Sequence, residues 1–261
     1  MERAEGNVTS KGAVLECRNV GRSFDSCDGG RNEVLRGMDF EVHENEFLVL
    51  FGAGQCGKTT LLNILAGLDM PTKGEVFTRG KKVTGPAPER GVVYQKTSLF
   101  PWMTVEDNVG FGPKVRHMPA KERSSRIKKY LDLVGLSGFE KSYPSQLSGG
   151  MRQRAGIARA YANQPDIMLM DEPFGHLDAQ TRYMMEEELQ RIWQKEKRTV
   201  VFVTNNIEEA LFLADRIILL TNCPTHIKEE YIIDMPHPRD YVDPEFLRLR
   251  QLITDNMDLT L

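Results

Sequence analysis

The sequence predicts an α/β protein built around a mostly parallel sheet, and two observations support this prediction. Short apolar runs typical of buried strands alternate with segments of helical period, which is the pattern of βαβ units. One apolar run also leads directly into a glycine-rich turn and a helix. The expected strands are 14–20, 46–51, 91–94, 167–170, 199–203 and 216–220, and the expected helices are 58–68, 120–134, 179–196, 207–214 and one that begins after Ser148.

The glycine-rich turn, residues 52–59, matches the pattern G-x-x-x-x-G-K-[ST] at every fixed position. Its glycines let backbone N–H groups converge on phosphate oxygens, and the following helix adds the positive end of its dipole. We expect Lys58 to reach the β- and γ-phosphates of a nucleoside triphosphate, and the Thr59 hydroxyl to ligate Mg²⁺. The expected nucleotide contacts here are Gly52, Ala53, Gly54, Gln55, Cys56, Gly57, Lys58, Thr59 and Thr60.

Two carboxylates follow the apolar strand 167–170. At this strand tip Asp171 is expected to hold Mg²⁺, directly or through water. Glu172, one residue further and pointing elsewhere, is expected to polarise the attacking water as general base. A plain Asp-Glu-Pro turn is the alternative interpretation, and the nearby phosphate loop disfavours it.

Composition narrows the function classes. The formal net charge of −3 and the pI near 6.0 disfavour a protein whose main task is nucleic-acid binding, so the basic side chains of 120–134 are interpreted as a solvated helix face.

The four cysteines contain no C-x-x-C pair, which suits reduced thiols in a cytosolic compartment. Cys56 is interpreted as a passive loop residue, with a redox switch as the alternative. No apolar run approaches the ~18 residues that span a bilayer, so any membrane role is expected to come through a partner.

Residues 147–154, Leu-Ser-Gly-Gly-Met-Arg-Gln-Arg, resemble the signature motif of the ABC-type ATPases and precede the acidic strand as they do in that family. Ser148 is suited to cap a helix, and the two glycines expose backbone N–H groups, which together make a second anion site. The resemblance implies a P-loop NTPase (RecA-like) core with an N-terminal antiparallel β subdomain. It also implies an inserted α-helical subdomain at about 97–160, within an ATPase domain of residues 13–222 that follows a flexible N-terminus, residues 1–12.

The resemblance further implies a dimer that sandwiches two ATP molecules, in which the signature of one subunit closes over the γ-phosphate held by the other. The signature residues expected to contact nucleotide are Ser148, Gly149, Gly150 and Gln153. Gln95 matches the glutamine that senses Mg²⁺ and water, and Phe24 the aromatic that stacks on adenine. Asp178 matches the aspartate that couples the two sites.

One position departs from the family pattern. Most of these ATPases have Thr-His-Asp after the strand corresponding to 199–203, whereas this chain has Thr204, Asn205 and Asn206. The Asn205 amide can anchor phosphate by a hydrogen bond, but it is unable to titrate near pH 7. Three alternatives follow: a slower working homodimer, an asymmetric dimer whose second ATPase supplies the histidine, or an ATP-clamped regulatory subunit with little turnover.

The segments 88–95 and 99–105 are similar to those of the importer branch that handles nitrate, sulfonates and taurine. The resemblance implies a membrane permease whose short helix docks near 99–103, and an extracytoplasmic solute-binding protein that reaches this chain only through the permease. Phe100 and Trp102 have ordinary packing as the alternative interpretation. The chain is expected to lie peripherally on the cytoplasmic face of the membrane. The proline-rich stretch 223–261 is expected to be an irregular tail.

A rival class is the soluble ABC ATPase that works on DNA or ribosomes. Such proteins usually carry two phosphate loops or a long coiled-coil insertion, and this sequence shows neither. The single phosphate loop therefore favours a transport ATPase with no nucleic-acid partner.

Overall fold

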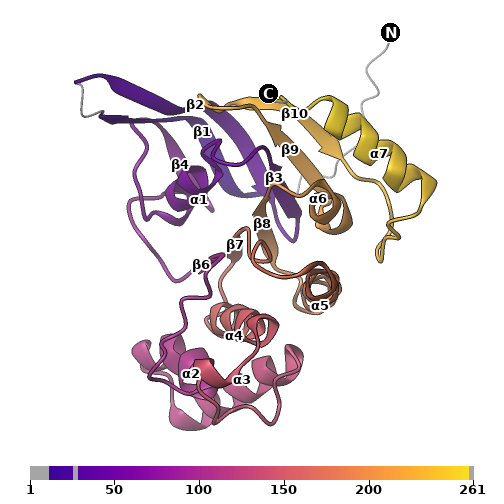
Figure 1. Ribbon diagram of the computed structural model, residues 1–261. Helices are drawn as coiled ribbons and strands as arrows, with labels where there is room; N and C mark the ends of the chain where they lie inside the picture. Colours follow the sequence, from indigo (N-terminus) through magenta and orange to yellow (C-terminus); the bar gives the residue numbers. More distant parts are fainter. Residues whose placement is uncertain (1–11, 26–28, 259–261) are drawn as a thin grey trace.

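A computed structural model of the protein describes residues 12–25 and 29–258, so that the expected flexible N-terminus lies, except for Gly12, outside the described residues. The strands form two sheets, and the helices flank them (Figure 1). Among the described residues, no helix is long and apolar enough to cross a membrane.

The larger sheet has six strands in the order β10-β9-β3-β8-β7-β6. Its members are β3 (Phe47–Phe51), β6 (Arg90–Val93), β7 (Ile167–Asp171), β8 (Thr199–Thr204), β9 (Arg216–Leu220) and β10 (Ile227–Ile232). All neighbouring pairs are parallel except β10 with β9, which is antiparallel. The mostly parallel sheet is therefore confirmed, with an antiparallel edge strand that the sequence did not indicate.

Central strand β3 shows why this sheet reads as continuous apolar runs. All five of its residues are buried. Phe47, Val49 and Phe51 face one hydrophobic cluster, whereas Leu48 and Leu50 face a second cluster on the opposite side. Successive side chains of a strand point to opposite faces, so a strand covered on both faces needs apolar residues at every position.

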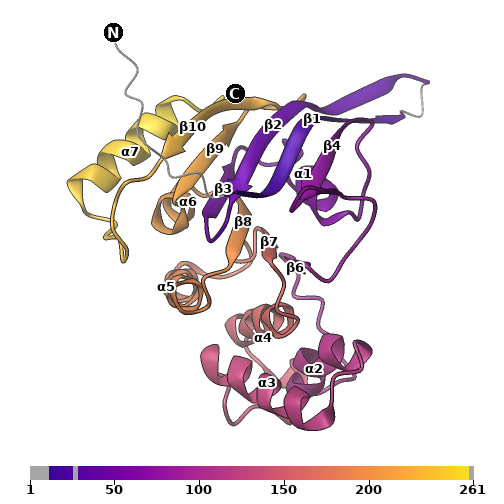
Figure 2. The ribbon, with the colours of Figure 1, turned by 180° about the vertical axis from the view of Figure 1, so that it is seen from behind.

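The second sheet has four antiparallel strands in the order β2-β1-β4-β5, and β1, β2 and β4 lie on the opposite side of the view from α7 (Figure 2). Its members are β1 (Ala13–Asp25), β2 (Arg31–His43), β4 (Lys73–Thr78) and β5 (Lys81–Lys82). Only the first part of β1 was indicated by the apolar pattern of the sequence. The sheet and its antiparallel pairing agree with the expected N-terminal β subdomain.

Helix α1 (Lys58–Ala66) follows β3, and helices α2 (Val105–Val115), α3 (Ala120–Leu133) and α4 (Gly149–Ala162) form a helical region at the lower end of Figure 1. The Thr104 side chain caps α2 by accepting a hydrogen bond from the Asp107 N–H, and Ser148 caps α4 in the same way. Helices α5 (Ala179–Glu196) and α6 (Ile207–Leu213) pack beside the large sheet, each after a strand, as the βαβ pattern predicts.

The prediction that residues 223–261 form an irregular tail is wrong for the described part. This segment contributes β10 to the large sheet and then forms α7 (Pro244–Asp255), which packs beside α6. Phe246, Leu249 and Ile253 of α7 are buried in the main hydrophobic cluster. The prolines interrupt the sequence pattern, but they lie outside the two elements except for Pro244. Pro244 takes the first position of α7, where the missing N–H has no cost.

A carboxylate on α5 is buried beneath this C-terminal segment. Glu186 is 1% exposed and accepts a hydrogen bond from the Tyr241 hydroxyl. Burial, together with the nearby Glu209, raises the pKa of Glu186 to about 7, although the Tyr241 bond and Arg182 act in the opposite sense. The Glu186 carboxyl group therefore binds its proton more tightly in the folded state than in the unfolded chain.

The stability of the protein should depend on pH through Glu186. Because the folded-state pKa of Glu186 is raised, the stabilisation from its protonated form is fully present near pH 4. This contribution to the free energy of unfolding is lost as pH rises through about 7. Glu186→Gln should raise the free energy of unfolding relative to the unmodified chain by on the order of 3 kcal/mol at pH 8 and by much less at pH 5. Urea denaturation at both pH values measures this, with the exposed neighbour Glu187→Gln as control. Parallel stability curves for the unmodified chain and Glu186→Gln would contradict the assignment.

Candidate functional site

The residues that the sequence predicts to bind phosphate and Mg²⁺ lie at one edge of the large sheet, together with Glu172 and Asn205. The strands β3, β8 and β7 are adjacent and parallel, with Phe51 paired to Thr204 and Asp171 paired to Val203. Their carboxyl ends therefore lie at the same edge, where ligands bind in open α/β sheets. The phosphate loop, Asn205 and Glu172 follow these three strand ends.

The phosphate loop connects β3 to α1 in a conformation that needs glycine. Gly57 has φ of 98°, and a Cβ there would lie 2.8 Å from Val34 Cγ1. Only glycine adopts this left-handed geometry without strain. Gly54 and Gln55 are exposed at the tip of the loop, and Thr60 lies in the first turn of α1. The second fixed glycine of the motif, Gly57, thus has a direct backbone reason.

Lys58 lies inside the loop and not on its surface. Only 4% of the residue is exposed. Its Nζ donates hydrogen bonds to the carbonyl oxygens of Gly52, at 3.0 Å, and Ala53, at 2.6 Å, and lies 3.5 Å from Glu172 Oε1. The ammonium group is therefore held at the centre of the loop, next to the predicted general base.

The predicted metal ligands are in direct contact. The Thr59 hydroxyl donates to both carboxylate oxygens of Asp171, at 3.1 and 3.0 Å. Burial raises the pKa of Asp171, so a cation would stabilise its charged form. Described residues contain no cluster of three or more His, Cys, Asp or Glu able to hold a metal. A hydroxyl and one carboxylate nevertheless suit Mg²⁺, which is usually bound by one or two protein ligands plus substrate phosphates.

Glu172 is held in a strained backbone conformation. Its φ is 40°, which is uncommon for a residue with a side chain. Its N–H donates to the Val203 carbonyl at 2.9 Å, and its own carbonyl accepts from the Gly175 N–H at 3.0 Å. Strain of this kind persists where the surroundings impose it and is concentrated at functional sites. In this conformation the Glu172 carboxylate lies beside the Lys58 ammonium group.

Asn205 is exposed immediately beyond β8, in a turn that is tied to α6. Thr204 Oγ1 donates to Glu209 Oε2 at 2.6 Å and accepts from the Asn206 N–H at 3.0 Å. Asn206 then caps α6 through its side-chain oxygen. The turn that carries Asn205 and the first turn of α6 are therefore linked by hydrogen bonds.

Gln95 follows β6 and lies against the loop after Glu172. A Cβ on Gly175 would come within 2.7 Å of Gln95 Nε2, so the glutamine side chain occupies the space that a larger residue would fill. Gln95 is half-buried. The structure thus places Gln95 beside the segment that carries the predicted base, and it shows no contact between Gln95 and Asp171.

The signature residues lie at the N-terminus of α4, well below α1 in both views (Figures 1 and 2). Ser148 and Gly149 are exposed, whereas Gly150 packs against α5, where a Cβ would lie 3.0 Å from Thr181 Cγ2. Gln153 differs from the expected surface residue, because it is only 3% exposed and its Nε2 has no partner. It lines an open pocket together with Gln95 and the exposed Gly149 of the signature.

Asp178 and Phe24 stand apart from the loop. Asp178 caps α5, and its carboxylate accepts from the N–H and the hydroxyl of Thr181. These bonds lower the pKa of Asp178. Phe24 lies near the end of β1 and is 40% exposed, with the Arg22 guanidinium 4.5 Å from its ring centre. No sequence motif marks this Arg22 contact, although the two residues lie two positions apart on the same strand.

Two further residues qualify the predictions for the phosphate loop. Burial is the largest influence on Cys56 and raises the pKa of its thiol, which favours the passive interpretation over a redox switch. Thr225, from the segment expected to be irregular, is fully buried and donates to the Cys56 carbonyl. No motif marks Thr225, so sequence reasoning missed this support behind the loop.

Comparisons with known proteins agree with this geometry. The family model described as ABC transporter matches residues 35–175. An uncharacterised ABC transporter ATP-binding protein of Methanocaldococcus jannaschii is 52% identical, over 92% of this chain and 89% of that protein. The nitrate import ATP-binding protein NrtD of Synechocystis sp. is 45% identical, over 85% of this chain and 83% of that protein. The taurine import ATP-binding protein TauB of Jannaschia sp. is 40% identical, over 91% and 88% respectively.

Among solved structures, a dimeric, post-hydrolysis ATP-binding cassette bound to ADP and Pi superimposes with a TM-score of 0.73 and is 30% identical. The match covers 85% of this chain and 100% of that chain. The P-loop NTPase fold expected from the sequence is thereby confirmed. On the family model, the shared identity and the shared fold, the chain belongs to the ABC transporter family and is one of its ATPases.

Proposed function

We propose that this chain is the ATP-hydrolysing subunit of an ABC importer, and that it works as part of a dimer on the cytoplasmic face of a membrane. The single observation that carries the proposal is the convergence of Lys58, Thr59, Asp171 and Glu172 at one sheet edge. Relatives named for nitrate, bicarbonate and taurine transport support the importer class.

Each residue of the site has a chemical task in this proposal. Backbone N–H groups of residues 52–59 bind the phosphates, and Lys58 moves its charge from the loop carbonyls to the β- and γ-phosphate oxygens. Thr59 and Asp171 would hold Mg²⁺, which neutralises charge on the phosphates when it is bound. Glu172 orients the attacking water and accepts its proton, and the Asn205 amide donates a hydrogen bond to the γ-phosphate.

The exposed signature residues suit a partner subunit. Ser148 and Gly149 present a capped helix N-terminus on α4, apart from the phosphate loop of the same chain. In the proposed dimer this N-terminus closes over the nucleotide of the second subunit, and Phe24 stacks on the adenine of the first. A cassette with the same fold is known as a dimer. The partner is a second copy, or a related ATPase that supplies the histidine absent at Asn205.

A groove between β6 and helices α2 and α4 suits the permease. It has a volume of about 610 Å³ and is lined by Phe100, Phe111 and Val115 together with the cationic Arg159. Phe100 packs on Phe111 with ring centres 4.7 Å apart, while Trp102 is 69% exposed. Phe100 is thus part of the helical packing, and Trp102 offers apolar surface that a helix of a membrane partner can cover.

Trp102→Glu should detach the chain from membranes without slowing its own ATP hydrolysis, because Trp102 lies outside the phosphate site. The measurement is the distribution of the full-length chain between membrane pellet and supernatant in lysed native cells, with phosphate release by the purified protein measured in parallel. Ile232→Glu, another exposed apolar position at 75% exposure on β10, is the matched control and should leave the distribution unchanged.

Mass spectrometry of the chain's partners after detergent extraction then identifies the class of transporter. A co-purified protein with membrane-spanning helices supports the proposal, and a small-anion solute-binding protein in the complex supports the nitrate, sulfonate or taurine group. Retention of Trp102→Glu in the membrane pellet would contradict docking of the permease over Trp102, which packs beside Phe100 at the edge of this groove. Bound nucleic acid in place of a permease would contradict the importer assignment.

A further inference from the structure

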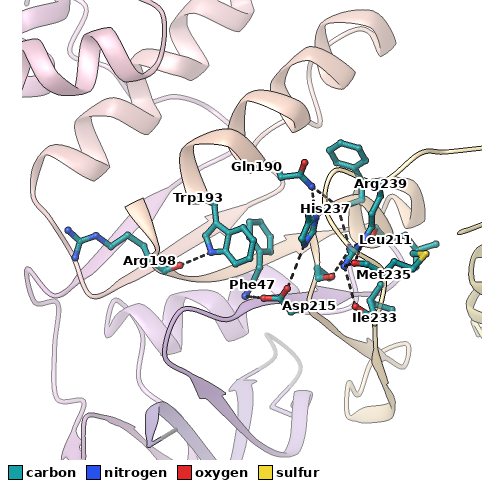
Figure 3. Close-up of polar contacts among 12 residues, drawn as sticks. Phe47, Gln190, Trp193, Arg198, Leu211, Asp215, Ile233, Met235, His237 and Arg239 are labelled. Carbon is teal, nitrogen blue, oxygen red and sulfur yellow. Dashed lines mark hydrogen bonds and ion pairs between the residues drawn. The ribbon is translucent and has the colours of Figure 1, made fainter. Parts of the chain in front are cut away.

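A buried arginine in the C-terminal segment holds one end of helix α6. Arg239 lies between β10 and α7 and is 7% exposed. Its Nη1 donates to the carbonyl oxygens of Leu211, at 2.5 Å, and Ala214, at 2.6 Å, at the C-terminus of α6 (Figure 3). Its Nη2 donates to the carbonyl oxygens of Ile233, at 3.2 Å, and Met235, at 3.1 Å.

This arrangement suits a cation at a helix C-terminus. The last carbonyl groups of a helix have no partner within it and carry the negative end of its dipole. Burial lowers the pKa of Arg239 to about 10, while Asp215 acts in the opposite sense, so the guanidinium stays charged at neutral pH. Its planar group reaches carbonyls of α6 and of the β10–α7 connection at once, which an ammonium group does not do as well.

The connection that carries Arg239 is itself fixed to the core. His237, two residues before it, contacts Gln190 of α5 at 2.6 Å through Nδ1 and lies 3.7 Å from Asp215 through Nε2 (Figure 3). Its ring packs edge-on against Trp193, with centres 5.6 Å apart. Asp215 in turn accepts from the Phe47 N–H at the start of β3. Arg239 therefore connects α6 to an anchored segment.

The opposite end of α6 follows the turn that contains Asn205, the position at which most of these ATPases have a histidine. This helix has seven residues, so its ends are only about 10 Å apart. Its Glu209 accepts from Thr204, and Asn206 caps its first turn, so the turn containing Asn205 moves with the helix. A shift at the Arg239 end is thus transmitted to the position of the Asn205 amide.

We infer that Arg239 is a positioning residue for ATP hydrolysis, which fixes α6 so that Asn205 meets the γ-phosphate. The inference rests on the proposed role of Asn205 in the phosphate site. It assigns the C-terminal segment a part in turnover that acts through α6. A purely structural role would lower the stability of the protein without changing the turnover of folded molecules.

The test is a double-mutant cycle in the full-length chain, with steady-state MgATP hydrolysis as the readout. Arg239→Met should lower kcat by about tenfold and change KM by less than about twofold, because misplaced groups slow chemistry more than they weaken binding. Asn205→Ala should also lower kcat. Adding Arg239→Met to Asn205→Ala should then have little further effect, because both changes remove the same contact. Arg239→Lys, which keeps the charge with fewer donors, should be intermediate.

Arg248→Met is the matched control, because Arg248 lies on α7 of the same segment and pairs, within the described part of the chain, only with exposed Glu245. Its kcat should equal that of the unmodified chain. Thermal denaturation gives the folded fraction for each variant, and Arg239→Lys enters the same cycle if Arg239→Met does not fold. Unchanged kcat in both Arg239 variants, or equal losses with and without Asn205, would overturn the inference while ATPase function stands. No turnover in the unmodified chain would overturn the proposed function and this inference with it.

Discussion

Replacing Glu172 with glutamine should lower steady-state ATP hydrolysis by about 100-fold or more, the usual effect of losing a positioned general base. Glu172 is the carboxylate that lies beside Lys58, and its strained backbone holds it there. Glutamine keeps the size of the side chain and removes only its basicity. Binding of MgATP should therefore be retained, and measurement of phosphate release alongside nucleotide binding separates the two effects.

The same variant should accumulate a dimer in the presence of MgATP, because nucleotide closes the two subunits and hydrolysis no longer reopens them. Size-exclusion chromatography with light scattering measures the mass directly. Glu122→Gln, an exposed carboxylate on α3, is the control and should retain both turnover and the unmodified mass distribution. An unchanged hydrolysis rate in Glu172→Gln would exclude Glu172 as the base.

Loss of Lys58 should have the second large effect, this time on binding. Lys58→Ala removes the one ammonium group at the centre of the phosphate loop and should weaken MgATP binding by about 100-fold, the scale of one or two charge-assisted hydrogen bonds. The ATP-induced rise in melting temperature should then disappear at concentrations that protect the unmodified chain. Thermal denaturation with and without roughly 1 mM MgATP, a concentration at the upper end of common KM values, measures this rise in melting temperature.

Lys128→Ala is the control for this experiment, since Lys128 is an exposed cation on α3. It should keep the full ATP-induced shift. If Lys58→Ala is protected by MgATP as strongly as the control, the lysine does not hold phosphate. A lower melting temperature of Lys58→Ala without nucleotide is compatible with the assignment, because Lys58 also bonds to the Gly52 and Ala53 carbonyls.

The sequence predicted the strands of the large sheet well because burial on both faces leaves continuous apolar runs, as in β3. It did not predict β10 or α7. Three exposed positions of β10 carry charged side chains, namely Lys228, Glu229 and Glu230. Prolines interrupt the sequence pattern after β10. The pairing of β10 with β9 is a tertiary contact, which local pattern does not encode.

The candidate site divides in the same way. The spacing of the phosphate motif fixed the positions of Lys58 and Thr59, because a continuous loop must place them together. Gln153 matches a motif by sequence letter, and its burial was not indicated by that match, because exposure depends on how the helix packs. Arg239 was not a candidate at all, because its partners are backbone carbonyls and carry no residue-specific signal.

The buried Thr225 and the anchored connection after β10 have a practical meaning for protein engineering. A reporter or tag attached beyond residue 258 is joined to a segment that supports both the back of the phosphate loop and the far end of α6. Force applied to α7 is transmitted through the β10–α7 connection and Arg239 to the far end of α6. Labels meant to be silent belong on the solvent side of α3, and labels meant to sense ATP belong at the C-terminus.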